Sequence, residues 1–193
     1  MILTFFHKSL HSLPDEELMA RVAANDDDRA YDELYHRHSR HLMGMLWGLL
    51  HNDEERAADL TQDTFLRVWS SRSNFHKDKS FRTWLYSIAY NLVKNEYRHE
   101  EYHEEYEQHI TSTEKEDEEN DFDIKLDGEA FDEALKKELS LLPPEKMMLF
   151  ALRFEEEMAV PQIAEVMEIA EGTVKSRLHN LIKTLKIKLK QYE

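Results

Sequence analysis

The sequence predicts an all-α protein made of two small helical domains that an acidic, flexible linker joins. Only four Gly and four Pro interrupt its 193 residues, and good helix formers such as Glu, Leu, Lys and Ala fill the stretches between them. Apolar residues recur at spacings of three and four on both sides of a densely acidic stretch. We therefore expect one domain at residues 1–99, a linker at 100–129 and a second domain at 130–193.

The composition limits the compartment and the class of protein. Hydrophobic residues make up 41% of the chain, which is enough for two modest cores. Cysteine is absent, so the chain has no disulfide framework and no thiolate site, and a reducing compartment is favoured. We read no signal peptide in MILTFFHKSLHSL and no run of about eighteen apolar residues. We therefore expect a cytoplasmic protein without membrane insertion.

The net charge of −15 argues at first against nucleic-acid binding, but the charge is unevenly distributed. Residues 1–99 carry 13 Lys and Arg against 15 Asp and Glu, and residues 139–193 carry eight of each. Residues 100–138 carry four basic residues against 17 acidic ones. Both flanking segments are thus close to neutral, and neither is excluded from contact with nucleic acid.

Two helices open the first domain. Acidic residues in the first turn of PDEELMARVAA favour a helix over 14–24. A longer helix over 29–50 follows, and its expected buried residues are Ala30, Leu34, Tyr35, Leu42, Met45, Leu46 and Leu49. Asn52 and Asp53 then cap the next helix.

The stretch 59–98 has the clearest pattern of the chain. Its first helix, 59–69, places Leu60, Phe65, Leu66 and Trp69 near one stripe, with Asp59, Gln62 and Asp63 on the opposite face. Together the four helices predict a bundle whose core contains Leu34, Leu42, Leu46, Leu60, Phe65, Trp69, Trp84, Leu85 and Ile88.

A polar loop with two lysines leads to the second helix of this stretch, 81–98. Its apolar stripe contains Trp84, Leu85, Ile88, Ala89, Leu92 and Val93. Beside that stripe lie Arg82, Tyr86, Tyr90, Asn91, Lys94, Asn95 and Arg98. Amides, aromatic rings and cations along one helix suit reading and stacking on bases. An ordinary amphipathic helix with a solvated polar face has the same pattern.

The histidines do not predict a metal site. His36, His38 and His41 are spaced by two and three residues, which spreads their rings around a helix, so we interpret them as polar surface residues. His99 and His103 have a convergent spacing but begin an acidic stretch, where we also expect no site. The chain has no catalytic triad, no glycine-rich phosphate loop and no carboxylate pair of defined spacing. We therefore expect neither a cofactor nor enzymatic activity.

The second domain follows a linker of about thirty residues, which can reach on the order of 100 Å when fully extended. Helices are predicted over 130–142 and 145–154 on either side of Pro143 and Pro144, with methionines in the core. A short helix with Ile163, Ala164 and Met167 inside, a turn at 168–170 and a longer helix complete the domain. Val174, Leu178, Leu181 or Ile182, Leu185 and Leu189 form the inner face of that last helix.

This last segment has the pattern of a helix-turn-helix, whose second helix enters the major groove of DNA. Residues 171–193 carry six cations against two carboxylates, a net charge of +4 that suits phosphate contacts. A lysine-rich amphipathic helix that packs on its neighbour is the alternative.

The order DLTQDTFLRVW, SNF, a polar loop and FRTWLYSIAYN resembles region 2 of the extracytoplasmic-function sigma factors of bacterial RNA polymerase. The resemblance implies that Asp59, Gln62 and Asp63 dock on the clamp helices of core RNA polymerase. It also implies that the loop and the helix after it capture the melted, single-stranded minus-ten promoter DNA. The residues concerned are Asn74, His76, Lys77, Lys79, Ser80, Arg82, Tyr86, Asn91, Lys94, Asn95 and Arg98.

IAEVMEIAEGTVKSRLH resembles region 4 of the same family, which reads the duplex minus-thirty-five element and contacts the polymerase flap. The match implies that Thr173, Lys175, Ser176, Arg177, His179 and Lys183 face the DNA. In this family an anti-sigma factor or a recruiting protein is a further partner. The acidic linker is expected, from the same resemblance, to follow the basic RNA-exit path of the polymerase.

The chain departs from the pattern of region 4 at several positions. Ala170 replaces the usual helix-capping residue, and Glu171 adds negative charge near the DNA face. Asn180, Leu181 and Ile182 stand where basic residues are common. We therefore hypothesise weak minus-thirty-five binding, with Leu181 or Ile182, if exposed, contacting a recruiter.

Two other functions are compatible with parts of the pattern. A stand-alone helix-turn-helix regulator would bind duplex DNA without needing the DLTQD face, and a decoy would occupy the polymerase without initiating. The expected function is that of an alternative sigma factor, which directs core polymerase to promoters.

Overall fold

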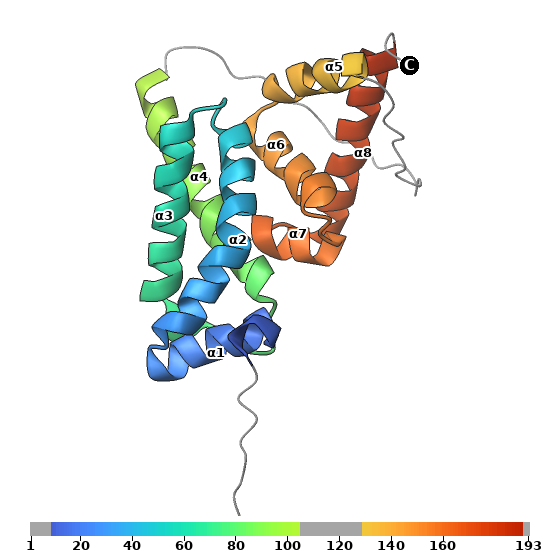
Figure 1. Cartoon of the computed structure of the whole chain (residues 1–193). Helices are drawn as coiled ribbons and strands as arrows, with labels where there is room; N and C mark the ends of the chain where they lie inside the picture. Colours follow the sequence, from blue (N-terminus) through green and yellow to red (C-terminus); the bar gives the residue numbers. More distant parts are fainter. Residues whose placement is uncertain (1–8, 105–128, 191–193) are drawn as a thin grey trace, which may run out of the picture. The chain divides into compact units, whose positions relative to one another are not determined.

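The computed structural model describes residues 9–104 and 129–190, and these residues form eight α-helices and no strand (Figure 1). The helices divide between two compact units, Met1–Val93 and Lys94–Glu193, each of which is described by itself. The prediction of an all-α chain with two small helical parts is confirmed.

The first unit is a bundle in which α2 packs against both α1 and α3. Its elements are η1 (Leu10–Ser12), α1 (Asp15–Asn25), α2 (Asp28–Leu49), α3 (Glu54–Ser70), η2 (Arg72–Asn74) and the part of α4 (Phe81–Glu104) up to Val93. Two aspartates begin helices: Asp27 accepts a hydrogen bond from the Ala30 N–H at 3.2 Å, and Asp53 accepts one from the Arg56 N–H at 3.0 Å. The cap expected at Asp53 is therefore present.

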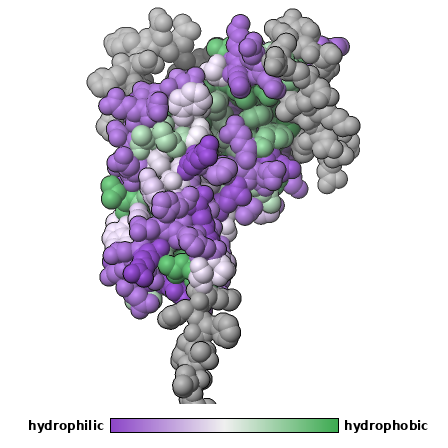
Figure 2. Space-filling view, viewed as in Figure 1, coloured by the Kyte–Doolittle hydropathy of each residue, from purple (hydrophilic) through white to green (hydrophobic). Residues whose placement is uncertain are grey.

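Apolar residues from all four helices meet in the core of this unit. Its fully buried side chains include Leu18, Met19, Val22, Leu34, Leu42, Leu46, Phe65, Phe81 and Leu85. Each such side chain contributes about 1.5–3 kcal/mol when it leaves water. Hydrophilic side chains cover most of the visible face of the bundle (Figure 2). Trp69, Trp84 and Ile88, which were expected inside, lie half-buried at the edge of the core.

Two residues expected on the apolar faces of their helices are exposed instead. Leu66 is 62% exposed, and Tyr35 is 38% exposed with its ring edge-on to Phe65 at 4.8 Å. The buried face of α3 passes through Leu60, Thr64, Phe65 and Val68. Because each helical residue turns by about 100°, burying Phe65 directs Leu66 outward.

α4 is longer than expected. The sequence predicts that it ends at Arg98, whereas the helix continues to Glu104, because no Gly or Pro follows Arg98 and Glu favours helix. Residues 100–104, expected in the linker, are therefore helical, and residues 105–128 of that linker lie outside the described part of the chain.

The second unit contains the remaining short helices and the last, long one. They are α5 (Glu129–Ser140), α6 (Pro144–Phe150), η3 (Ala151–Glu155), α7 (Val160–Met167) and α8 (Glu171–Leu189). The helix expected over 145–154 is split, because η3 is a π-helical turn in which the Glu156 N–H donates to the Ala151 carbonyl at 2.9 Å.

α7 and α8 form the predicted helix-turn-helix. Ile163, Val166 and Met167 of α7 are buried, as are Val174 and Leu178 of α8. Ala164, expected inside, is only half-buried. The turn depends on Glu168, which ends α7 in the left-handed conformation with φ 56° and ψ 40° and donates its N–H to the Ala164 carbonyl.

A glutamate in the left-handed region is strained, because its Cβ crowds the backbone. We predict that Glu168→Gly stabilises the second unit by about 0.5–1 kcal/mol, the relief of strain being partly offset by the greater freedom of glycine when unfolded. Hydrogen exchange of the α7 and α8 amides measures this change. Glu168→Ala, which keeps the Cβ, should give no gain, and equal stabilisation by both variants would contradict the explanation.

Candidate nucleic-acid interface

One polar stripe of α3 faces solvent. Asp59, Gln62 and Asp63 are all exposed, as predicted. Leu66 follows them at the same helical spacing and adds an exposed apolar side chain to the end of the stripe. The sequence pattern placed Leu66 near the apolar stripe on the opposite face of this helix, so the exposed stripe was expected to be purely polar. We call these four residues the α3 docking stripe.

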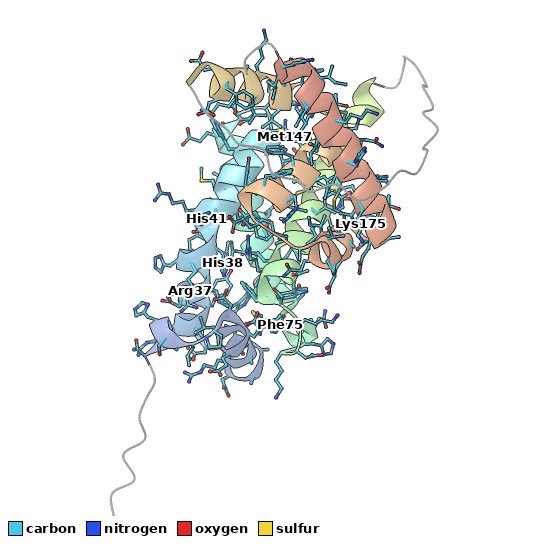
Figure 3. All side chains as sticks on the ribbon, turned by 90° about the vertical axis from the view of Figure 1, so that its right-hand side faces the viewer. Arg37, His38, His41, Phe75, Met147 and Lys175 are labelled. Atoms are coloured by element: carbon cyan, nitrogen blue, oxygen red, sulfur yellow. The ribbon has the colours of Figure 1, made fainter. Side chains whose placement is uncertain are left out.

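The loop between η2 and α4 is attached to the bundle by one aromatic side chain. Phe75 is buried, and its ring lies 5.2 Å from that of Trp84 and 6.1 Å from that of Phe81 (Figure 3). The remaining residues of the loop point outward: Asn74, His76, Lys77 and Lys79 are exposed. The Lys79 N–H donates to the His76 carbonyl at 2.9 Å, which closes a turn. This arrangement displays both lysines on a fixed support.

Ser80 has a structural role at the start of α4. It is half-buried, and its hydroxyl oxygen accepts a hydrogen bond from the Thr83 N–H at 3.3 Å. This is the geometry of a helix cap. Ser80 was predicted to contact DNA, and in the structure its side chain caps α4.

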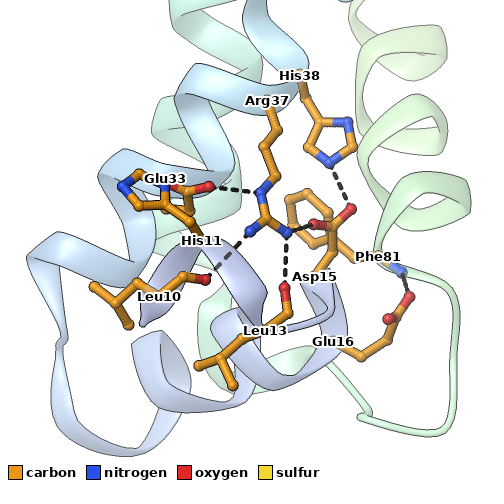
Figure 4. A network of polar contacts seen from close by, with 9 residues as sticks. All are labelled: Leu10, His11, Leu13, Asp15, Glu16, Glu33, Arg37, His38 and Phe81. Carbon is orange, nitrogen blue, oxygen red and sulfur yellow. Dashed lines mark hydrogen bonds and ion pairs between the residues drawn. The ribbon is translucent and has the colours of Figure 1, made fainter. Parts of the chain in front are cut away.

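A network centred on Arg37 of α2 fixes the helices beneath this loop (Figure 4). Arg37 donates from Nε to Glu33 at 2.7 Å, from Nη1 to the Asp15 carboxylate at 2.8 Å and from Nη1 to the Leu13 carbonyl at 2.8 Å. Nη2 donates to the Leu10 carbonyl at 3.2 Å. One guanidinium thus connects η1, α1 and α2.

The same network reaches the first residue of α4. His38 Nε2 lies 2.7 Å from the other oxygen of Asp15, and its ring is 5.4 Å from that of Phe81. Glu16, next to Asp15, accepts a hydrogen bond from the Phe81 N–H at 3.0 Å. His38 is therefore a tertiary contact, whereas His36 and His41 are exposed as expected.

The charges of the network act on its carboxylates. Burial would raise the pKa of Asp15, but the hydrogen bonds and charges of His38 and Arg37 outweigh burial and hold that pKa below its usual value. The hydrogen bond from Arg37 likewise lowers the pKa of Glu33. Both groups therefore remain anionic partners of Arg37 at neutral pH.

α4 presents amides and cations along the helix that follows the loop. Asn91 and Asn95 are exposed, and Arg82 and Lys94 are half-buried. Tyr86 is only 1% exposed, so the expectation that its ring is displayed to DNA is wrong; it lies in the core, with the Arg82 guanidinium 5.9 Å from the ring centre. Tyr90 is also buried. Arg98, His99 and His103 lie in the part of α4 whose side chains are not described.

α8 presents cations along its outer face. Lys175 and Lys183 are exposed, whereas Thr173 and His179 are half-buried. Arg177 lies 3.4 Å from Glu145 of α6, and the Ser176 hydroxyl donates to the Thr173 carbonyl at 3.1 Å. Lys186 and Lys190 continue the exposed series toward the end of the helix. These cations suit a phosphate backbone.

The start of α8 has no side-chain cap, as the alanine at position 170 predicts. Leu181 and Ile182 are both buried, at 3% and 5% exposure, so the hypothesis that one of them contacts a recruiter is wrong. They face inward because α8 packs against three helices, α5, α6 and α7, and this widens its buried face. The exposed apolar residue of α8 is Ile187, at 69%.

Within the described residues, no three His, Cys, Asp or Glu side chains gather as metal ligands. A search of the same residues finds no helix that is both long and apolar enough to cross a membrane. The exposed functional groups are amides, carboxylates and cations on helices, which suit binding surfaces.

Comparison with known proteins identifies both halves of the chain. The family model for Sigma-70 region 2 matches residues 34–101, and that for Sigma-70, region 4 matches residues 132–185. The RNA polymerase sigma-H factor of Pseudomonas aeruginosa is 30% identical over 173 residues, which cover 85% of this chain and 88% of that protein.

Two solved structures have a similar fold. The structure of CnrH in complex with the cytosolic domain of CnrY aligns with a TM-score of 0.66 at 20% identity and covers 93% of this chain and 99% of that one. The sigma factor RpoE in complex with the anti-sigma factor NepR from Bartonella quintana aligns with a TM-score of 0.62 at 21% identity, covering 83% and 96%.

The contact between Glu16 and Phe81 gives a direct test of how the loop is held. We predict that Glu16→Ala accelerates hydrogen exchange of the Phe81 amide about 5–10-fold, because the first N–H of α4 loses its acceptor. Glu17→Ala changes an exposed neighbour on the same helix and should leave this rate unchanged. Equal rates in the two variants would show that Glu16 does not anchor α4.

Proposed function

The chain belongs to the extracytoplasmic-function sigma factors of bacterial RNA polymerase, and from this premise we propose a separate task for each of its exposed surfaces. It is an alternative sigma factor, which binds core polymerase and directs transcription initiation at promoters. The observation that carries this conclusion is the presence of region 2 and region 4 in that order within one chain. The residue assignments below are our proposals.

The α3 docking stripe binds the clamp helices of core polymerase. Its carboxylates and amide offer polar contacts, and Leu66 offers an apolar anchor that water reaches freely before binding. An exposed leucine beside charged residues is typical of a protein interface, where a few apolar anchors carry most of the binding free energy. The stripe belongs to α3 alone, so docking does not require the DNA-binding loop.

The loop and α4 capture the melted minus-ten strand. Lys77 and Lys79 are placed for phosphates, while Asn91 and Asn95 on α4 present amides that form hydrogen bonds with base edges. The burial of Tyr86 removes it from this set. Phe75 and the Glu16 contact hold the loop in place, which lowers the entropy lost on binding.

α8 reads the duplex minus-thirty-five element. Thr173, Lys175 and Ser176 lie in its first two turns, where a recognition helix meets base edges. Because Ala170 provides no cap, N–H groups at the start of α8 are free to donate to a DNA phosphate. Glu171, in the first turn, opposes this contact by its negative charge, and we infer that minus-thirty-five binding is weaker than it would be without a carboxylate at this position.

The remaining proposals concern partners and place of action. Sigma factors are generally non-enzymatic, and we infer that this chain has no catalytic activity of its own. It acts in the cytoplasm, where core polymerase lies. The complex of RpoE with NepR supports an anti-sigma factor as a further partner, and a recruiting protein is the other partner class that weak duplex binding favours.

Run-off transcription with core polymerase from the native host tests the proposed function. Specific transcripts from a library of duplex and pre-melted templates are expected, and they supply the promoter consensus. Core binding without any transcript would favour a decoy. Failure to bind core polymerase would favour a stand-alone regulator.

We predict that Leu66→Ser weakens binding to core polymerase about 5–30-fold, because the docking stripe loses its apolar anchor. Protein stability should change little, since Leu66 is 62% exposed. Fluorescence anisotropy of the labelled chain titrated with core polymerase measures the affinity. Leu66→Met, which keeps an apolar side chain, serves as the control and should bind nearly as well as the wild type.

We predict that Lys79→Ala reduces open-complex formation several-fold. The slope of the logarithm of promoter affinity against the logarithm of salt concentration should fall by about one, the value for one lost phosphate contact. Binding to core polymerase should be unchanged. Permanganate footprinting at several salt concentrations measures the open complex. Asp78→Ala, which removes a carboxylate between the two lysines, should increase or preserve opening; a loss equal to that of Lys79→Ala would argue against a charge-based role.

A further inference from the structure

One exposed face of α2 takes no part in the functions proposed above. His36, Arg40, Gly44 and Trp47 are spaced by four, four and three residues, so they lie along one side of the helix over about three turns. All four are exposed, and Trp47 keeps 46% of its surface in water. We call these residues the α2 outer stripe.

Gly44 is unusual at the centre of this stripe. Glycine in the middle of a helix destabilises it by roughly 0.5–1 kcal/mol relative to alanine. A Cβ built at Gly44 meets no atom within 4 Å, so no internal contact requires glycine here. A residue that weakens its own helix without an internal reason suits a position that another molecule approaches closely.

The charge of this part of α2 is also distinct. The sequence from Leu34 to Asn52 contains no Asp or Glu, although the whole chain has a net charge of −15. The charge of Arg37 is balanced by ion pairs with Asp15 and Glu33. Arg40 is exposed and has no ion-pair partner among the described residues.

We propose that the α2 outer stripe binds an acidic α-helix of a partner protein. Trp47 is the apolar anchor, since tryptophan is the residue type most enriched among interface residues of high binding free energy. Gly44, one turn before it, lets the partner helix approach the backbone of α2. Arg40 pairs with a carboxylate of the partner, and His36 extends the contact by one turn.

The charge of the stripe disfavours a nucleic acid as its occupant. A nucleic acid presents a phosphate at every nucleotide, whereas Arg40 is the single residue of this stripe that is charged when histidine is neutral. The stripe differs in this respect from α8, whose exposed face carries four lysines.

Site-specific photo-crosslinking tests the proposal in the full-length protein. A photoreactive amino acid at position 47 is expressed in the native host, and the same amino acid at the exposed position Glu17 of α1 is the control. We expect a crosslink specific to position 47, which mass spectrometry maps to a helical protein segment with excess Asp and Glu. That segment, made as a peptide, is then the probe for binding measurements.

Two variants separate binding from folding. Trp47→Ala should weaken binding of the mapped peptide at least tenfold. Gly44→Leu should do the same by blocking close approach, although it replaces glycine with a good helix former and should raise the melting temperature. Loss of binding in a more stable protein cannot arise from misfolding. Both variants should support run-off transcription with purified core polymerase at the wild-type level.

Several results would overturn the proposal. Crosslinks at position 47 that map to nucleic acid, to core polymerase or to a segment without acidic excess would assign the stripe to another occupant. A pattern identical to that at position 17, or wild-type affinity of Gly44→Leu for the mapped peptide, would remove the proposed contact. Reduced core binding by Trp47→Ala would make the stripe part of the polymerase interface; this outcome leaves the sigma function itself intact.

Discussion

Two adjacent carboxylates at the start of α1 connect three helices. Asp15 contacts Arg37 and His38 of α2, and Glu16 accepts a hydrogen bond from the N–H of Phe81, the first residue of α4. Arg37 also donates hydrogen bonds to the carbonyls of Leu10 and Leu13, so each polar group of this partly buried cluster has a partner. Removing one member takes a hydrogen-bond partner from a partly buried group, which is unfavourable. The position at which α4 begins, and hence the loop before it, therefore depends on contacts with residues more than sixty positions earlier in the chain.

The chain combines a large negative charge with DNA binding by keeping opposite charges apart. Residues 100–138 contain nearly all of the acidic excess, while exposed lysines lie on the loop and on α8. Two cations of α8 form ion pairs within the second unit, Arg177 with Glu145 and Lys188 with Glu138. The exposed lysines of the loop and of α8 define the surfaces proposed to contact phosphates.

Helical periodicity was sufficient to predict the helices, their order and most of the core. It could not decide which of two neighbouring apolar residues faces inward: Leu66 was placed near the apolar stripe of its helix but is exposed, and Tyr86 was placed beside the apolar stripe of α4 but is buried. Leu181 and Ile182 show the same limit. The sequence predicted that one of the two lies on the inner face of α8, whereas both are buried because three helices pack against α8. Contacts that join distant residues leave no periodic signal, which is why His38 was interpreted as surface and the Arg37 network was not predicted. Residue type alone did predict the cap at Asp53 and the missing cap at Ala170.

Three residues of this chain lower the stability of the helices they belong to or flank. The contacts within the protein explain them to different degrees. The tight turn between α7 and α8 requires a left-handed backbone conformation at Glu168, which explains the conformation. The structure does not explain why the residue is a glutamate. Ala170 leaves the first N–H groups of α8 without a side-chain acceptor. Gly44 weakens α2 while meeting no neighbour at all. Since packing inside the protein accounts for neither the alanine nor the glycine, both positions are better explained by molecules outside the chain. For Ala170 the proposed molecule is DNA, and for Gly44, which lies between Arg40 and Trp47 on α2, it is the proposed partner protein.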